Sequence, residues 1–234
     1  MAISALVVVL AATVTIVLAT RDSGSSALPA TSTSVASTPV SSTTKPPATT
    51  PSTTSGTTPA PLIPGYQVVV PAGVNAAWDI PADWKIDPSA SSFGTGTDQV
   101  PLAGLAQEGV DYCPNFVRTN MFLSIAQQPD PSAAATDIGA RMARIGWSPL
   151  TSTRAGNPEP FDSSDHTLHG VFVETSGTFT PPDPHCASTY SVYTFAVAGG
   201  STGALVLTIA ADTGVDRAVN RDFARRLLAT FRLF

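Results

Sequence analysis

A stretch rich in serine, threonine and proline limits how much of this chain can fold. Between Thr31 and Pro61, 18 of the 31 residues are Ser or Thr and 6 are Pro. Few of these side chains could offset the conformational entropy lost on ordering, and proline favours extended polyproline II backbone. We therefore expect residues 21–61 to form a disordered stalk, either O-glycosylated or a plain linker. Only residues 62–234 are expected to form a packed domain.

An apolar run precedes the stalk. Residues 2–20 carry no charge, and as a helix they would be about 28 Å long, close to the roughly 30 Å hydrocarbon core of a bilayer. The alternative is a secretory signal with a cleavage site at the small residues of Val17–Ala19. The length of the run and the lack of a preceding Lys or Arg favour a transmembrane anchor. The missing positive flank also indicates a natural start upstream of Met1. No cysteine follows the run, which excludes a lipoprotein anchor.

The charge of the domain restricts its partners. Residues 62–234 contain 10 Lys or Arg and 16 Asp or Glu, so acidic side chains outnumber basic ones. This balance argues against nucleic acid and against an anionic membrane surface as partners.

The chain has only two cysteines, Cys113 and Cys186. Outside the cytoplasm two cysteines are usually paired, and the anchor and stalk favour that location. A bridge would close a loop of about 74 residues and, through chain entropy, could contribute about 4 kcal/mol. It would tie the early half of the domain to the late half. The chain has no CxxC motif, so redox catalysis and structural zinc lack their usual pattern.

The hydrophobic pattern predicts an α+β domain with a mainly antiparallel sheet and two packed helices. Alternating or continuous apolar runs predict strands, and the loop "GGSTG" predicts a hairpin between the last two runs. The predicted strands are 66–70, 102–108, 121–127, 168–176, 189–198 and 204–211, with two shorter runs around 76–86.

Local signals place the two helices. Asp130 caps the first helix, Pro131 takes its first position and Gly146 ends it. The second helix is predicted to begin at a capping box formed by Thr213 and Asp216. Apolar residues then recur every four positions along one stripe: Val215, Val219, Phe223, Leu227 and Phe231.

Three residues are candidates for catalytic or metal-binding groups. Ser201 lies in a G-x-S-x-G pattern, but a strand-like segment follows it where a nucleophile elbow needs a helix. His166 and His169 would share a face only on a helix, and this segment is predicted to be a strand. The sequence therefore predicts no catalytic residue, no metal site and no cofactor.

Two groups of residues are candidates for a ligand or partner surface. Trp78, Trp84 and Trp147 could line a pocket, although tryptophan near such turns is more often a core residue. Arg217, Arg221 and Arg225 would form one ridge on the second predicted helix, where a partner could dock. The alternative is that the ridge is only the solvated face of that helix.

Two segments of the domain resemble known proteins. "VPAGVNAAWDIPADWKI" (70–86) and "DFARRLLATFRLF" (222–234) look like uncharacterised actinobacterial proteins with a transmembrane helix, a stalk and a secreted domain of unknown function. The "IPADW" turn and the closing "ATFRL" also resemble the Mog1/PsbP-like fold of some envelope lipoproteins. The resemblance implies an envelope location and a Mog1/PsbP-like fold, and it carries no agreed catalytic residues. This chain departs from the lipoproteins because it lacks a lipidated cysteine.

Three classes of function remain open. The first is a non-catalytic binding or interaction module of the cell envelope, held by residues 2–20 in the membrane with its domain outside the cytoplasm. Its partner would be an envelope protein or a cell-wall component. The second is a carrier or sensor for a small apolar or lipid-like ligand. The third is a hydrolase around Ser201 or a metal enzyme around His166. The stalk and the lack of a convergent catalytic set favour the first.

Overall fold

The computed structural model describes residues 59–199 and 203–234. The predicted anchor (2–20), nearly all of the predicted stalk and Ser201 lie outside the described residues. Within the part that is described, no helix is long and apolar enough to cross a membrane.

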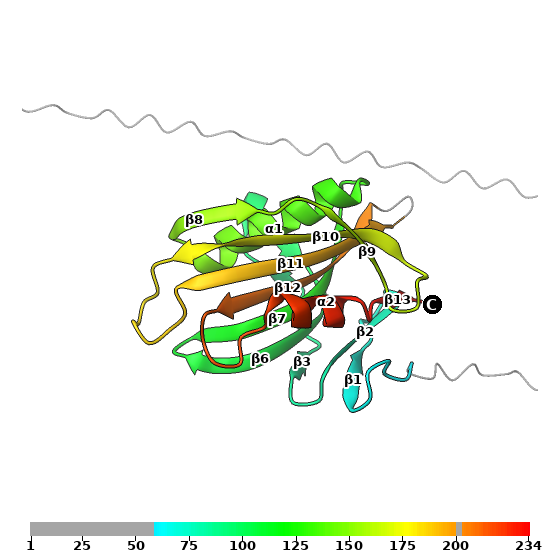
Figure 1. Ribbon diagram of the computed structural model, residues 1–234, viewed down its shortest axis with the longest axis horizontal. Helices are drawn as coiled ribbons and strands as arrows, with labels where there is room; N and C mark the ends of the chain where they lie inside the picture. The colour runs from blue at the N-terminus through cyan, green and yellow to red at the C-terminus, as the bar shows by residue number, and fades with distance from the viewer. Residues whose placement is uncertain (1–58, 200–202) are drawn as a thin grey trace, which may run out of the picture. The chain divides into compact units, whose positions relative to one another are not determined.

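The larger sheet is the central element of the domain, and each of its strand pairs is antiparallel (Figure 1). From edge to edge it runs β3 (Lys85–Asp87), β6 (Ala103–Cys113), β7 (Phe116–Ala126), β12 (Ala204–Thr213), β11 (Thr189–Ala198), β10 (His169–Phe179) and β8 (Leu150–Ala155), with β9 (Glu159–Asp162) also paired to β10. β11 and β12 pair as neighbours, as the predicted hairpin requires.

Two smaller sheets and a short 3-10 helix complete the strand structure. The first small sheet runs β1 (Tyr66–Val69), β2 (Ala76–Pro81) and β13 (Arg232–Leu233), and the second pairs β4 (Ser92–Phe93) with β5 (Val100–Pro101). The 3-10 helix η1 (Gly96–Asp98) lies between β4 and β5 in the sequence.

The first helix begins where the sequence predicts. In α1 (Pro131–Trp147), the side chain of Asp130 accepts a hydrogen bond from the backbone N–H of Ala133 at 2.7 Å. Its end differs from the prediction, because Gly146 lies inside the helix and Ser148 is the C-terminal cap. Gly146 does not have the positive φ of a helix-ending glycine.

The second helix begins later than predicted. α2 (Arg221–Leu228) is capped by Asn220, whose side chain accepts from the backbone N–H of Phe223 at 2.9 Å. Thr213 is not its cap, because β12 continues through Thr213 and pairs it with Thr189. Val219 belongs to the predicted apolar stripe, but it precedes the helix. It is apolar because it is buried against the sheet.

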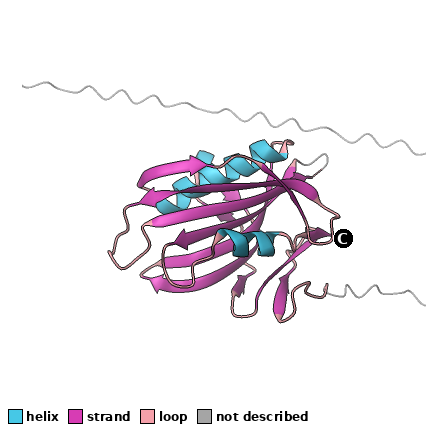
Figure 2. Cartoon of the chain, in the orientation of Figure 1, coloured by secondary structure: helices cyan, strands magenta, loops and turns pink. Residues whose placement is uncertain are grey.

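The sheet is buried on both faces, so the domain has three layers. Figure 2 shows α1 behind the sheet and α2 in front of it. Successive residues of one strand alternate between the two cores: Phe195 belongs to the core under α2, and Ala196 belongs to the core under α1. Among the described residues, the two α-helices and the mainly antiparallel sheet confirm the predicted α+β class.

The chain enters the domain beside its last strand. The backbone N–H groups of Leu62 and Ile63 donate to Oδ2 of buried Asp79 on β2, at 2.6 and 2.8 Å. Arg232 on β13 donates to Oδ1 of Asp79 at 3.0 Å and to the carbonyl of Ala60 at 3.1 Å. We call these contacts the Asp79 clamp.

The predicted disulfide between Cys113 and Cys186 is present, with 5.7 Å between the two Cα atoms. Cys113 ends β6, and Cys186 lies in the loop between β10 and β11. The bond therefore joins the early and late halves of the domain, as expected from the sequence.

Candidate functional site

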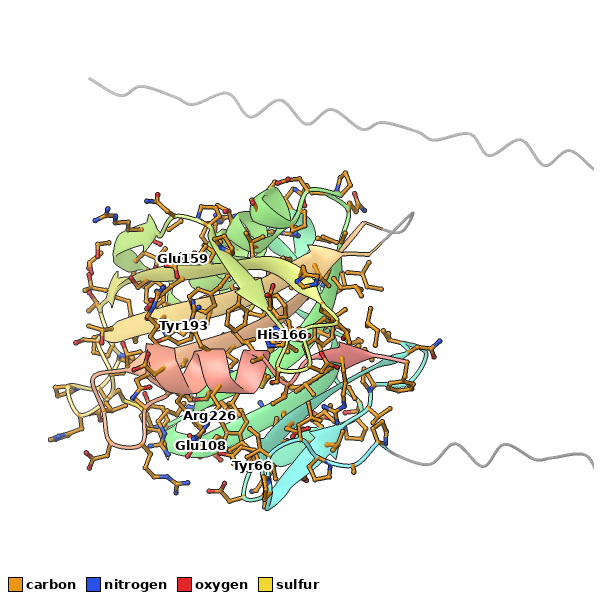
Figure 3. All side chains as sticks on the ribbon, turned by 45° about the vertical axis from the view of Figure 1, so that its right-hand side comes forward. Tyr66, Glu108, Glu159, His166, Tyr193 and Arg226 are labelled. Carbon is orange, nitrogen blue, oxygen red and sulfur yellow. A yellow bond between two sulfur atoms is a disulfide. The ribbon has the colours of Figure 1, made fainter. Side chains whose placement is uncertain are left out.

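A groove lies beside α2, between that helix and the strands β1 and β6. We call it the α2 groove. Its volume is about 370 Å³. Figure 3 shows Tyr66, Glu108 and Arg226 on this side of the molecule. Its lining combines aromatic and charged side chains with two aliphatic ones: Tyr66, Trp84 and Phe223; Asp83, Glu108, Arg217 and Arg226; Pro81 and Val219.

Local structure fixes the aromatic wall of the groove. The turn after β2 brings Trp84 back, since its backbone N–H donates to the carbonyl of Pro81 at 3.1 Å. The side chain of Gln67 then holds the Trp84 carbonyl at 2.7 Å. Arg226 on α2 donates to the hydroxyl of Tyr66 at 3.0 Å and lies 5.0 Å from the ring centroid of Phe223. The wall is therefore held by polar contacts at its edges.

A buried carboxylate organises the charges of the groove. Glu108 is only 7% exposed, and Arg118 donates to both of its carboxylate oxygens, at 2.8 and 2.7 Å. This hydrogen bonding raises the pKa of Arg118. Arg217 lies 3.5 Å from Glu108 and pairs with Asp83 at 2.6 Å. Glu108 thus lies between two guanidinium groups.

A neighbouring cavity of about 320 Å³ shares Asp83, Glu108 and Arg217 with the groove, and its lining adds Lys85 and Arg118. Across both cavities four cationic side chains face two carboxylates, those of Asp83 and Glu108. The domain as a whole has more acids than bases, so this surface has the opposite charge balance to the domain. Such a surface favours an anionic ligand.

The structure separates the residues that the sequence grouped as a surface. Trp84 and Arg217 both line the α2 groove. Trp78 does not belong to a surface, because it is fully buried, in the core under α2.

The predicted arginine ridge does not exist as one helix face. Arg217 precedes α2 and has a positive φ of 62°. Arg221 and Arg225 are on α2, but both pair with Glu159 of β9. Each also lies over the ring of Phe172, at 4.8 and 4.7 Å. These two side chains therefore cover the core of this domain.

The two histidines meet at one exposed carboxylate. Nδ1 of His169 is 2.9 Å from Asp162, and Nδ1 of His166 is 3.8 Å from the same carboxylate. The hydrogen bond from His169 lowers the pKa of Asp162. Both imidazoles are open to solvent: the side chain of His166 is 78% exposed and that of His169 is 70% exposed. Residues 59–199 and 203–234 contain no group of three His, Cys, Asp or Glu side chains that could hold a metal ion.

Sequence reasoning missed Asp212, which is 2% exposed at the end of β12. Its carboxylate accepts hydrogen bonds from the hydroxyl of Tyr112 and from Nε1–H of Trp147. Burial raises the pKa of Asp212. The sequence signal for Asp212 is that it is the single acid at the end of the apolar run "ALVLTIAAD". A carboxylate in a strand buried on both faces needs hydrogen-bond partners, so its position indicates a buried polar cluster.

A comparison with models of known protein families finds a match for this chain. The model of a family described as "Domain of unknown function (DUF8017)" matches residues 59–234. No curated protein matches the chain.

Solved structures offer two distant likenesses. The chain is similar to the solution structure of PsbP from Synechocystis sp. PCC 6803, with 14% identity, a TM-score of 0.41, and coverage of 76% of this chain and 98% of PsbP. A crystal structure from Bacteroides thetaiotaomicron VPI-5482 has 12% identity and a TM-score of 0.31 over 68% of this chain, which spans 45% of that protein. The expected likeness to PsbP is thus found, at a TM-score that carries no inference about function. The resemblance to actinobacterial envelope proteins stays a prediction.

Proposed function

Because the chain belongs to the DUF8017 family, whose description names no activity, we propose from its own geometry that it is a non-catalytic binding module of the cell envelope. Its ligand is an anionic envelope component with flat apolar faces, and the α2 groove is the binding surface.

The observation that carries this proposal is the combination of the aromatic rings of the α2 groove with the excess of positive charge across the groove and the cavity next to it. Tyr66 and Phe223 offer partly buried ring faces there. Lys85, Arg217 and Arg226 are exposed beside them. Aromatic side chains give a rigid apolar contact at low entropic cost, and neighbouring cations attract and orient an anion. An acidic polysaccharide has both of the required surfaces, because its sugar rings are flat and its carboxylates are charged.

We also propose that the domain lies outside the cytoplasm. Residues 2–20 hold the chain in the membrane, and residues 21–61 extend the domain away from it on the outer side. The uncharged run and the Ser/Thr/Pro composition support this arrangement. A proline-rich spacer of this length keeps the groove at a distance from the bilayer. The third class of function has weaker support, because both histidines are exposed and neither lines the α2 groove or the cavity next to it.

The groove is tested by binding of polygalacturonate, an acidic polysaccharide, to the full chain in maltoside detergent. We expect salt-sensitive binding, and no binding of uncharged dextran. The double variant Lys85→Glu/Arg226→Glu is expected to weaken binding about tenfold or more, because two attractive charges become repulsive.

The matched control makes the same charge change away from the groove. Arg144→Glu/Arg154→Glu alters two exposed arginines, on α1 and on β8. It should retain the wild-type affinity. Equal losses in the two double variants would show general charge attraction and would contradict the proposal, as would equal binding of dextran.

The location is tested separately by adding protease to intact cells that express the natural gene. We expect the domain to be digested from outside while an N-terminal fragment stays in the membrane. A domain that is protected in cells with a permeable outer layer contradicts the location. A soluble form that begins near Thr20 would show a cleaved signal in place of an anchor.

A further inference from the structure

A separate cavity lies beside the C-terminal turn of α1. Its volume is about 240 Å³, which is below the roughly 300–1,000 Å³ of sites for drug-sized ligands. Three aromatic rings, three amides and one carboxylate define its chemistry: Phe93, Phe116, Trp147, Gln107, Asn115, Asn120 and Asp212. Ala210 in its lining belongs to the core under α1, whereas Val219 of the α2 groove belongs to the core under α2. The two sites are therefore on opposite sides of the sheet.

The carboxylate of this cavity is held by neutral groups. Asp212 accepts one hydrogen bond from Tyr112 and one from Trp147, and neither donor carries a positive charge. The charged neighbour of this cluster is Arg118, which lies 5.0 Å from the ring centroid of Tyr112 and donates to Glu108. Among the ion pairs of residues 59–199 and 203–234, none includes Asp212. An ionised Asp212 is thus a buried anion without a paired cation, which is costly.

Oxygen atoms of the carboxylate still have acceptor capacity, because an ionised carboxylate offers about four lone-pair sites and two of them are used. The cavity also supplies aromatic walls. One face of Trp147 is covered by Tyr190, with the ring centroids 4.4 Å apart. Phe93 is fixed by an edge contact with Phe122, at 5.2 Å between ring centroids. These rings are held in place by neighbours, so the walls are largely formed before a ligand enters.

We propose that this cavity binds a small organic cation, with Asp212 as its counter-charge and the rings of Phe93, Phe116 and Trp147 as its walls. A cation supplies the positive charge that the buried carboxylate lacks. The faces of aromatic rings attract cations, most strongly where water is excluded. The cavity volume suits a ligand the size of choline. This site shares neither Asp212 nor its aromatic walls with the α2 groove, so each proposal can fail without the other.

The acid–base state of Asp212 gives the site a pH dependence. Burial raises the pKa of Asp212, while hydrogen bonds from Tyr112 and Trp147 and the charge of Arg118 lower it. Below that pKa the acid is neutral and attracts no cation. Binding of a quaternary ammonium ion, which does not titrate, is therefore expected to strengthen as the pH rises through the pKa of Asp212.

The test compares choline with its uncharged carbon isostere, in which carbon replaces the nitrogen atom. Isothermal titration calorimetry on the full chain in maltoside detergent measures both affinities. We expect choline to bind about tenfold more tightly or better, because shape and apolar surface are the same and only the charge differs. This comparison needs no variant, so it stands even where a substitution harms folding.

A variant of Asp212 then tests whether this residue supplies the negative charge that attracts the cation. Asp212→Asn is expected to remove the preference for choline, while its amide oxygen can still accept from Trp147. Asp216→Asn is the matched control, because it makes the same charge change at an exposed residue four positions away and should keep the preference. Equal affinity for the two ligands, no measurable choline binding, or a preference that survives in Asp212→Asn would each overturn the proposal.

Discussion

At the scale of single residues, Gly104 shows where the packing of the core depends on a missing side chain. Gly104 has a φ of +67°, and a Cβ added there would lie 2.7 Å from the ring of Trp78. We expect Gly104→Ala to lower the free energy of unfolding by about 1–3 kcal/mol, through backbone strain and overpacking. Urea unfolding followed by circular dichroism measures the change.

The matched control is Gly146→Ala. Gly146 lies in α1, has an ordinary φ, and has nothing within 4 Å of an added Cβ. The same substitution is expected to raise stability there by up to about 1 kcal/mol, because alanine is the better helix former. A loss of stability at both sites, or at neither, would contradict the packing described for Trp78.

A second prediction at this scale concerns pH. Burial raises the pKa of Asp212 above the ordinary 3.8 of an aspartate. The contribution of Asp212 to the free energy of unfolding is therefore fully present below pH 3.8. It is lost as the pH rises through the raised pKa of Asp212 in the folded protein. Urea unfolding of wild type and Asp212→Asn from pH 3 to 8 should show wild type losing stability relative to the variant as the pH rises.

Asp98 provides the opposite case. Its hydrogen bond with Arg144 lowers the pKa of Asp98, so its contribution is present above pH 3.8 and is lost as the pH falls through the lowered value. Wild type should therefore gain stability relative to Asp98→Asn as the pH rises. Parallel slopes for the two variants would contradict this account of Asp212.

At the scale of elements, α2 tests which of two neighbouring capping signals starts the helix. Asn220 is the cap, since its side chain accepts from Phe223 N–H. We expect Asn220→Ala to cost about 1 kcal/mol of stability. Asp216→Ala should change stability by less than about 0.5 kcal/mol, because this exposed residue precedes the helix. Urea unfolding of the two variants decides the matter, and the reverse order of effects would support the capping box at Thr213.

The accuracy of the sequence prediction differs between elements for physical reasons. The start of α1 was predictable, because Asp130 and Pro131 act locally. The runs that became β11 and β12 were also predictable, because strands buried on both faces are apolar throughout. β8 and β9 were missed, because the exposed residues of "LTSTRA" have no apolar pattern and their pairing with β10 depends on the rest of the fold.

The candidate sites were predicted only in part. Trp84 and Arg217 were identified because residue type alone marks aromatic and cationic candidates. Their meeting in one groove could not be read from the sequence, because they are 133 positions apart. The sequence left Arg221 and Arg225 as either a partner surface or a solvated helix face, whereas β9 places Glu159 beside both of them. Their partner is thus a strand that the hydrophobic pattern did not reveal.

At the scale of the whole molecule, the disulfide links the two halves of the domain. Replacing Cys113 or Cys186 with Ser is expected to lower stability by about 2–5 kcal/mol. The double variant should cost little more than either single one, because both remove the same bond. Reductant should lower the stability of wild type to that of the double variant and leave the double variant unchanged. Two alkylated cysteines in unreduced, denatured protein would contradict the bond in the natural protein.

The Asp79 clamp has a mechanical consequence when the domain is pulled from its N-terminal side. Tension on the chain at residue 60 reaches Asp79 and Arg232 before it reaches β1, because the clamp holds Leu62 and Ile63 ahead of that strand. The load is therefore divided between β2 and β13, and β1 is not peeled away by itself. Tyr66, the wall of the α2 groove on β1, stays in place until the clamp breaks. In single-molecule pulling from the N-terminal side, we expect β1 of Asp79→Asn to detach at a lower force than β1 of wild type. The groove would thus keep its shape under shear only while the Asp79 carboxylate holds Leu62 and Ile63.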